Sequence, residues 1–460
     1  MTVQAPTPFA DRVRMLGLMR SRFRVNFVAA TAATAATVAL TALSYPVYLS
    51  YAGYERFGVW LLVSTVLSLA QLTSFGIGPA VTYMVAQEHR RGALLGVASI
   101  IRGALALVTA TGLVAGAGLV LFGELLVSGA GIAGASAVQA RQAMPFVAVL
   151  TIGSLWLQVL ASAVSGLRRL DLSVGVDTAG RVVAFAFTAT LLWRGGGLVS
   201  FLVGTAVGQV CMAAAYVQCI RRHVPFRSFS AARLEWDRIF GMLRISSGVF
   251  GGSVLVLLLH PFNRVLVSRF VGVAAVPVLE IGFNSAMQFR SLFEAGFRAI
   301  TPEISRSAAL PGPESLERAK DVCLNGRRLV LLLGAPAWIA AALAAGPIFD
   351  LWLGDRFEPG IPAAFRIVAV GAFASLLVVP SYYALLGLAR TRQIFVHHFV
   401  QSALNVLGGT GLVLIRPQIT VLGVASVVTV SMLGGSLYLW AQERRLLPAG
   451  DQARRWSAPR

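Results

Sequence analysis

Long apolar runs recur along the chain, and the short stretches between them collect charged and turn-forming residues. About 20 apolar residues suffice for an α-helix to cross a hydrocarbon core roughly 30 Å thick. The pattern predicts twelve transmembrane helices, near residues 25–49, 57–84, 103–123, 144–165, 174–193, 198–219, 245–268, 278–300, 329–348, 364–388, 394–415 and 420–441. An even number of crossings places both termini on the same side of the membrane.

The composition agrees with this pattern. Hydrophobic residues make up 57% of the 460 residues and charged residues 13%, with a mean hydropathy of +0.75. A soluble domain usually has about 25% charged residues. The chain is therefore typical of an all-α polytopic membrane protein, and its short connections leave no room for a sizeable soluble domain.

The net charge of +20 is explained by membrane topology rather than by nucleic-acid binding. Basic residues collect on the cytoplasmic side of membrane proteins. With the N-terminus inside, most of the 39 basic residues, all of them arginine except Lys320, fall in the tails and the inner connections. The outer connections hold Arg56, Arg141, Arg194, Arg269, Arg356 and Arg416. Both termini are predicted to be cytoplasmic, and no nucleic acid is expected as a partner.

The chain divides at its most basic inner connection, residues 220–244. We predict a basic N-tail at 1–24, a first six-helix bundle at 25–219, a second at 245–441 and a cytoplasmic C-tail at 442–460. The second part of the 220–244 linker is either an interfacial helix, with Trp236, Phe240 and Leu243 toward lipid, or a solvated segment. Paired six-helix bundles are typical of repeat-built transporters.

The sequence lacks the residue patterns of a membrane enzyme. The longest outer connection, 124–143, has one Glu, one Arg and no His. A glycosyltransferase, polymerase or ligase needs acid–base or metal-binding residues that face its substrate. The five histidines and three cysteines show no metal-site spacing, and no phosphate-binding loop pattern occurs. We predict a protein that is not an enzyme and that uses no metal or cofactor.

Residues 284–298 (NSAMQFRSLFEAGFR) place charged side chains inside a predicted membrane helix. Arg290, Glu294 and Arg298 are spaced i, i+4, i+8, so they share one helical face. A central arginine costs about 2.5–3.5 kcal/mol on insertion scales, and such residues generally face a bundle interior or a watery cavity. Alternatively, the three charges neutralise one another as i,i+4 pairs, although two cations against one anion leave a positive excess.

Further polar residues accompany these charges. The stripe is widened by Glu280, Asn284, Gln288 and Ser291. In the preceding helix, a kink is expected at Pro261, beside His260, Asn263 and Arg264. Arg264 and Arg298 are near enough to the membrane surfaces to snorkel, and Arg181 and Arg366 lie close to helix ends. Because guanidinium groups match phosphate geometry with two parallel hydrogen bonds, the arginines favour a ligand that carries phosphate.

Several stretches carry a family resemblance: YAGYERFGVWLLVSTVLSLAQLTSFGIGPAVTYMVAQEHRRG, SAVSGLRRLDL, LVSRFVGVAAVPVLEIGFNSAMQFRSLFEAGFRAITPEISR and IFDLWLGDRFEPG. Together they resemble the Wzx-type polysaccharide (O-antigen) flippases of the multidrug/oligosaccharidyl-lipid/polysaccharide exporter superfamily, over nearly the whole chain. The resemblance implies two six-helix bundles around a central cavity. Expected hinge or kink positions are Gly76, Gly78, Pro79 and Pro261.

The resemblance also implies a function. Such flippases move a polyprenyl-diphosphate-linked oligosaccharide from the inner to the outer leaflet of a bacterial cytoplasmic membrane by alternating access, commonly driven by an ion gradient. H+ or Na+ is then the expected coupling ion. The residues expected to hold the diphosphate or line the cavity are Arg290, Arg298, Arg264, Arg181, Asn263, Asn284 and Gln288. Ser74 and Asn263 stand where relatives often have acidic residues, which leaves Glu280 and Glu294 as candidates for ion coupling or charge balance.

Two alternatives stay open at this point. A multidrug or organic-cation antiporter of the same superfamily should carry acidic groups in its cavity, whereas the in-membrane excess here is basic. A membrane-embedded glycan polymerase or ligase should have a large catalytic outer loop, which the sequence lacks. Beside the lipid bilayer, other polysaccharide-export proteins are candidate partners, and the sequence does not distinguish O-antigen from capsule or exopolysaccharide.

Overall fold

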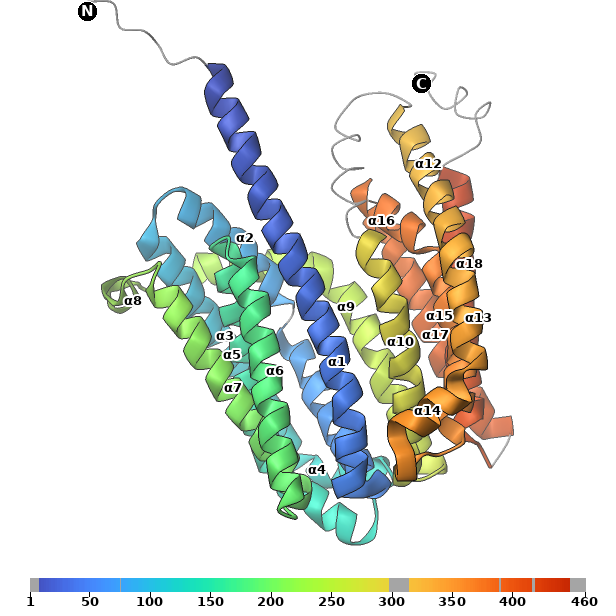
Figure 1. Ribbon diagram of the computed structural model, residues 1–460. Coiled ribbons are helices and arrows are strands. Elements are labelled where there is room, and N and C mark those ends of the chain that lie inside the picture. Colours follow the sequence, from blue (N-terminus) through green and yellow to red (C-terminus); the bar gives the residue numbers. More distant parts are fainter. Residues whose placement is uncertain (1–7, 75, 298–313, 389, 416–417, 447–460) are drawn as a thin grey trace, which may run out of the picture.

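Two groups of helices stand side by side in the computed structural model, which describes residues 8–74, 76–297, 314–388, 390–415 and 418–446 (Figure 1). Every regular element in these ranges is a helix, which confirms the all-α prediction. We call the group α1–α8 the first lobe and the group α9–α18 the second lobe. Arg298, which was predicted to bind the substrate, lies outside the described residues.

The first lobe begins with a long helix that turns back on itself. Its elements are α1 (Pro8–Ala70), η1 (Gln71–Ser74), α2 (Ile77–Arg90), α3 (Leu94–Leu121), α4 (Gly123–Gly129), α5 (Gly134–Gly166), α6 (Leu170–Trp193), α7 (Gly197–Arg221) and α8 (Phe226–Ala231). Gly53 breaks α1 with a φ of 71°, a conformation that glycine adopts at little cost. The chain descends along α1 and returns toward α2 (Figure 1). The predicted outer connection between the helices at 25–49 and 57–84, which contains Arg56, is therefore a sharp kink between two helical arms.

The second lobe begins inside the predicted linker. Its elements are α9 (Trp236–Phe270), η2 (Val273–Ala275), α10 (Val276–Phe297), α12 (Glu314–Leu329), the π-helical η3 (Val330–Gly334), α13 (Ala335–Leu343), α14 (Ala345–Leu353), η4 (Gly354–Arg356), α15 (Gly360–Leu377), α16 (Val379–Gly387), α17 (Thr391–Ile415) and α18 (Val421–Leu446). The segment expected to be interfacial or solvated is the first part of α9. There Trp236 and Phe240 are exposed, while Ile239 and Met242 are buried.

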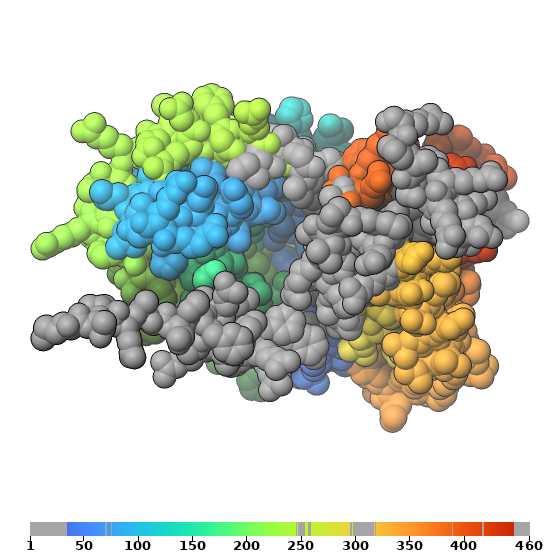
Figure 2. Space-filling model, turned by 90° about the horizontal axis from the view of Figure 1, so that it is seen from above, coloured from blue at the N-terminus to red at the C-terminus, as the bar shows by residue number. Residues whose placement is uncertain are grey.

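Nine spans among the described residues are long and apolar enough to cross a membrane. One of them, Ala35–Ser74, folds back at Gly53 and so supplies two crossings. The helices α9 and α10, which carry the in-membrane charges, supply two more and complete the two bundles. The arrangement therefore accommodates twelve crossings in two lobes, as predicted. Viewed from the end at which α1 begins, the lobes occupy opposite sides of the molecule (Figure 2).

One hydrophobic core cluster connects the lobes. It contains Leu49 and Phe57 of α1 together with Ile281 of α10 and Ile361 and Phe365 of α15. The first lobe also contacts the second through α9, η2 and α10. These contacts position the polar residues of α9 and α10 against the first lobe.

Candidate functional site

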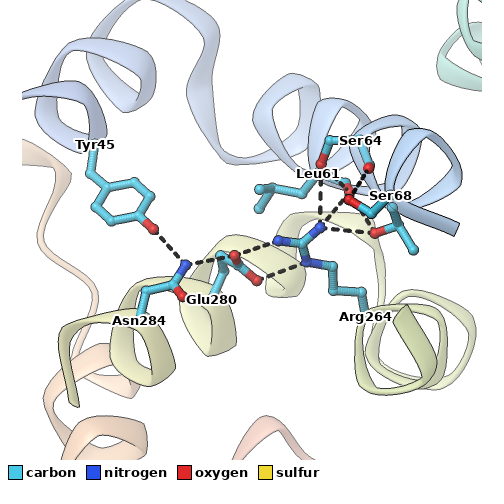
Figure 3. A network of polar contacts seen from close by, with 8 residues as sticks. Tyr45, Leu61, Ser64, Ser68, Arg264, Glu280 and Asn284 are labelled. Carbon is cyan, nitrogen blue, oxygen red and sulfur yellow. Dashed lines mark hydrogen bonds and ion pairs between the residues drawn. The ribbon is translucent and has the colours of Figure 1, made fainter. Parts of the chain in front are cut away.

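A polar network joins α9 and α10 to α1 across the boundary between the lobes (Figure 3). Arg264 donates to both carboxylate oxygens of Glu280, with an Nε–Oε2 distance of 2.8 Å and an Nη2–Oε1 distance of 2.5 Å. The Nη1 group of Arg264 donates to three oxygens of α1: the Leu61 carbonyl at 3.1 Å, the Ser64 hydroxyl at 3.3 Å and the Thr65 hydroxyl at 2.9 Å. Every nitrogen of this guanidinium therefore has a partner.

Asn284 extends this network to a second part of α1. Its amide nitrogen donates to Glu280 Oε1 at 2.6 Å and to the Tyr45 hydroxyl at 2.8 Å. The side chains of Arg264 and Glu280 are only 15% and 6% exposed. We call this set, with the three α1 oxygens, the interlobe network. Three predicted site residues, Arg264, Glu280 and Asn284, therefore bond to one another and to α1 across the boundary between the lobes.

Asn263 lies outside the interlobe network, in the interior of the second lobe. Its amide nitrogen donates to the Leu259 carbonyl at 3.0 Å, and its amide group exchanges hydrogen bonds with that of Asn405 in α17 at 3.2 and 3.4 Å. Both asparagines are buried. Asn263 therefore links two helices of one lobe, and the adjacent Pro261 lies within the continuous helix α9.

A cavity of about 290 Å³ lies among α9, α10, α15, α16, α17 and α18, and we call it the second-lobe cavity. Its charged residues are Arg290 and Glu294. Histidines and aromatic residues complete much of the wall: His260, Phe283, Tyr382, Tyr383, His397 and His398. Sequence patterns could not predict that Tyr382 and Tyr383 of α16 and the two histidines of α17 line this cavity, because only packing brings these helices to α10.

Arg290 is incompletely bonded in this cavity. Its Nη1 lies 3.0 Å from Glu294 Oε2, and the Tyr383 hydroxyl donates to Glu294 Oε1 at 2.8 Å. The Arg290 and Glu294 side chains are 19% and 18% exposed, yet the Nε of Arg290 is buried without a hydrogen-bond partner among the described residues. At 1.5 Å per residue, Arg290 lies about 21 Å along α10 from its start. An unpaired buried donor is costly, so this nitrogen is suited to an acceptor on a ligand.

Arg181 lines a smaller cavity of about 190 Å³ in the first lobe, between α1, α6 and α7. It is exposed and has no hydrogen-bond or ion-pair partner among the described residues. Its neighbours in the wall include Thr41, Ser44, Tyr48 and Trp60. Gln288 is half-buried on α10, and Arg366 donates to the Ala342 carbonyl at 2.9 Å. The predicted site residues are therefore divided between a structural contact and one cavity in each lobe, and the polar stripe of α10 itself reaches only the contact and the second-lobe cavity.

Comparisons with known proteins identify the fold. Neither a protein-family model nor a curated protein matches the sequence. An inward-facing multidrug resistance MATE family transporter of the MOP superfamily matches with a TM-score of 0.75 at 13% identity, covering 91% of this chain and 96% of that chain. The lipid II flippase MurJ, in an inward closed conformation, matches with a TM-score of 0.70 at 14% identity, covering 90% and 86%.

An outward-facing MATE family transporter matches less well, with a TM-score of 0.60 at 11% identity and coverages of 94% and 97%. The arrangement of the helices is thus nearer to that of the inward-facing structure. The position of the interlobe network agrees with this closer match, because the network connects the two lobes in the half of the molecule where α1 turns back at Gly53. The chain has the two-lobed fold that the MATE transporters share with MurJ.

Proposed function

We propose that the protein is a flippase of the bacterial cytoplasmic membrane. It moves a polyprenyl-diphosphate-linked oligosaccharide from the inner to the outer leaflet by alternating access between its two lobes. The observation that carries this proposal is the Nε of Arg290, which lies buried in the second-lobe cavity with no partner in the described residues. A diphosphate oxygen is a suitable acceptor for that donor. The fold shared with a lipid II flippase supports the same conclusion.

The other predicted site residues take different roles in this proposal. Arg181 lines the first-lobe cavity without an ion-pair partner among the described residues, so it can contact the substrate when the lobes rearrange. Arg264, Glu280 and Asn284 hold the outer half closed while substrate enters from the cytoplasmic side. Glu294 balances Arg290 and, with Glu280, stays a candidate for coupling to H+ or Na+.

A second candidate function, export of an organic cation, is favoured by other residues of the same cavity. Glu294 supplies a carboxylate, and Phe283, Tyr382 and Tyr383 supply aromatic rings. Aromatic faces attract cations, and a carboxylate strengthens that attraction. Because Arg290 opposes a cation and assists an anion, its removal distinguishes the two functions.

The test is translocation by the full-length protein in proteoliposomes, comparing the wild type with Arg290→Gln. Charge-assisted hydrogen bonds contribute about 1.5–3 kcal/mol, so we expect flipping of a polyprenyl-diphosphate oligosaccharide to fall about tenfold or more. The matched control is Arg141→Gln, which removes an exposed arginine paired with Glu124 and should flip normally.

Equal flipping by the wild type and a folded Arg290→Gln protein would remove Arg290 from the mechanism. No flipping by the wild type, together with transport of an organic cation that Arg290→Gln preserves or increases, would replace the flippase by the cation exporter. Loss of transport in Arg141→Gln as well would show that the effect does not depend on the cavity.

A further inference from the structure

A basic cleft lies at the end of the first lobe at which α1 begins, away from both cavities. Three connections build it: the end of α2, the turn between α5 and α6, and the segment after α7. The cleft measures about 400 Å³ and is lined by His89, Arg90, Leu167, Arg168, Arg169 and His223. The α2–α3 connection (light blue) and the segments after α7 (lime) reach this face in Figure 2. The positive-inside pattern predicts that it faces the cytoplasm.

Close helix packing fixes the walls of the cleft. The Thr82 hydroxyl of α2 donates to the Ser162 carbonyl of α5 at 3.1 Å. A Cβ at Gly166 would lie 2.8 Å from the Thr82 carbonyl oxygen, so only glycine lets these helices approach so closely. Immediately after this contact, Arg168 adopts a φ of 64°, a conformation in which glycine is the usual residue after a helix.

The positive charge of the cleft is largely uncompensated. Arg90 and Arg168 are exposed and make no hydrogen bond or ion pair within the described part of the chain. Arg169 lies 3.4 Å from Asp171. The neighbouring Glu88 is engaged by Arg91 at 3.1 Å and by Arg238 at 3.8 Å. Two arginines therefore remain available to a ligand.

Two histidines add hydrogen-bonding groups. The Nδ1 of His89 is buried and has no hydrogen-bond partner in the part of the chain that the structure describes. The Nδ1 of His223 lies 2.9 Å from the Cys219 carbonyl, to which it must donate because a carbonyl oxygen only accepts. With Nδ1 as the donor to Cys219, the Nε2 of His223 donates to a phosphate oxygen only when the imidazole carries both protons. Arginine and histidine side chains gathered around one cleft supply the kind of N–H groups that bind phosphate oxygens.

We propose that this basic cleft binds the phosphate group of an anionic molecule. The source is either the headgroup of an anionic phospholipid in the adjacent leaflet or a soluble diphosphate. Leu170, beside Arg169, and Phe226, near His223, are exposed apolar residues that suit contact with a lipid. The proposal uses none of the residues of the second-lobe cavity, so it holds whatever substrate the protein transports.

The decisive variant is Arg168→Gly, which removes a cation of the cleft and places glycine where φ is 64°. Such a change should leave stability equal or raised, because glycine adopts this conformation without strain. Arg90→Gln is a second variant that leaves the backbone unaffected. The matched control is Arg227→Gln in α8, an exposed arginine on the same connection that does not line the cleft.

Native mass spectrometry of the full-length protein would count phosphatidylglycerol retained after purification from vesicles that mix it with phosphatidylcholine. In a second arm, inorganic pyrophosphate would be titrated into protein in phosphatidylcholine nanodiscs. We expect Arg168→Gly and Arg90→Gln to weaken binding at least fivefold while Arg227→Gln does not. Dependence on Arg168 in the first arm identifies a lipid, and in the second a soluble anion. Equal binding by all variants, or binding of neither probe, would overturn the proposal.

Discussion

The interlobe network and the second-lobe cavity each contain one arginine–glutamate pair, but their arginines are bonded to different extents. Arg264 bonds Glu280 and three oxygens of α1, which lie about two hundred residues earlier in the chain. Within the described part of the chain, Arg290 bonds only Glu294, one turn away on its own helix, and its Nε has no partner. Two similar pairs in neighbouring helices therefore serve different purposes. One fixes the lobes to each other, and the other leaves a donor free in a cavity.

This difference has an energetic consequence. Removing one partner of a buried ion pair costs about 3–5 kcal/mol, because it leaves an uncompensated charge. That cost applies fully to Arg264, which is held by fixed groups of both lobes. At Arg290 a ligand can supply the missing acceptor, so changes there should alter binding more than stability.

The largest effect is expected from Glu280→Gln. It leaves Arg264 as a buried cation among neutral groups, and we expect the free energy of unfolding to fall by about 3 kcal/mol. The lobes should also separate in the half that contains the network. Thermal unfolding in detergent would measure the first change. Spin labels at the exposed Leu125 of the first lobe and Leu351 of the second would measure the second as a longer, broader distance distribution.

A double variant provides the control for Glu280→Gln. Replacing both Arg264 and Glu280 by Met removes the charge together with its partner, and such replacements are often neutral or stabilising. It should recover most of the lost stability without restoring the tie to α1. If Glu280→Gln instead unfolds like the wild type and keeps its spin-label distances, the network does not hold the lobes together.

A smaller effect is expected from Glu294→Gln, which acts on the cavity side of the comparison. Under the proposed function, the carboxylate competes with the diphosphate of the substrate for Arg290, so its removal should tighten binding of a polyprenyl-diphosphate oligosaccharide about fivefold, or about 1 kcal/mol. Stability should change little. Binding to protein in nanodiscs would measure this, with the exposed Glu124→Gln as the control. Weaker binding of the anion, or loss of organic-cation binding, would favour the cation exporter.

Sequence patterns predicted the helices well because a membrane leaves few alternatives. Backbone groups in hydrocarbon must be satisfied within helices, so an apolar run long enough to cross is a reliable sign of one. Breaks within helices were harder to foresee. A break between residues 49 and 57 was predicted, but its form as a kink at the single residue Gly53, like the π-helical turn at Val330–Gly334, depends on local backbone geometry that hydrophobicity does not report. Likewise, the linker indicated a helix around Trp236 only as one alternative, and it did not indicate that this helix would continue into the predicted crossing as α9.

The candidate site was predictable only where its contacts are local. The i,i+4 pairing of Arg290 with Glu294, weighed from spacing alone, is present. Arg264 and Glu280 lie on different helices, and their pairing depends on the connection at η2. The α1 oxygens and Tyr45 carry no sign in the sequence that they meet α9 and α10. That Arg264 binds the substrate stays a prediction, and the protein groups that bond it here could not be foreseen from the sequence.

The smallest effect is expected from Tyr45→Phe, which tests how far the interlobe network depends on the hydrogen bond between Asn284 and Tyr45. The variant removes the Tyr45 hydroxyl, one of the two acceptors of the Asn284 amide nitrogen, but keeps the ring contacts of Tyr45 with Phe57 and Trp352. A typical hydrogen bond contributes about 1 kcal/mol, so unfolding should become easier by that amount, well below the effect of Glu280→Gln. The same thermal and spin-label measurements apply. A loss as large as that of Glu280→Gln would mean that the lobes are held mainly through Asn284 and Tyr45. In that case the ion pair would chiefly neutralise charge within the second lobe.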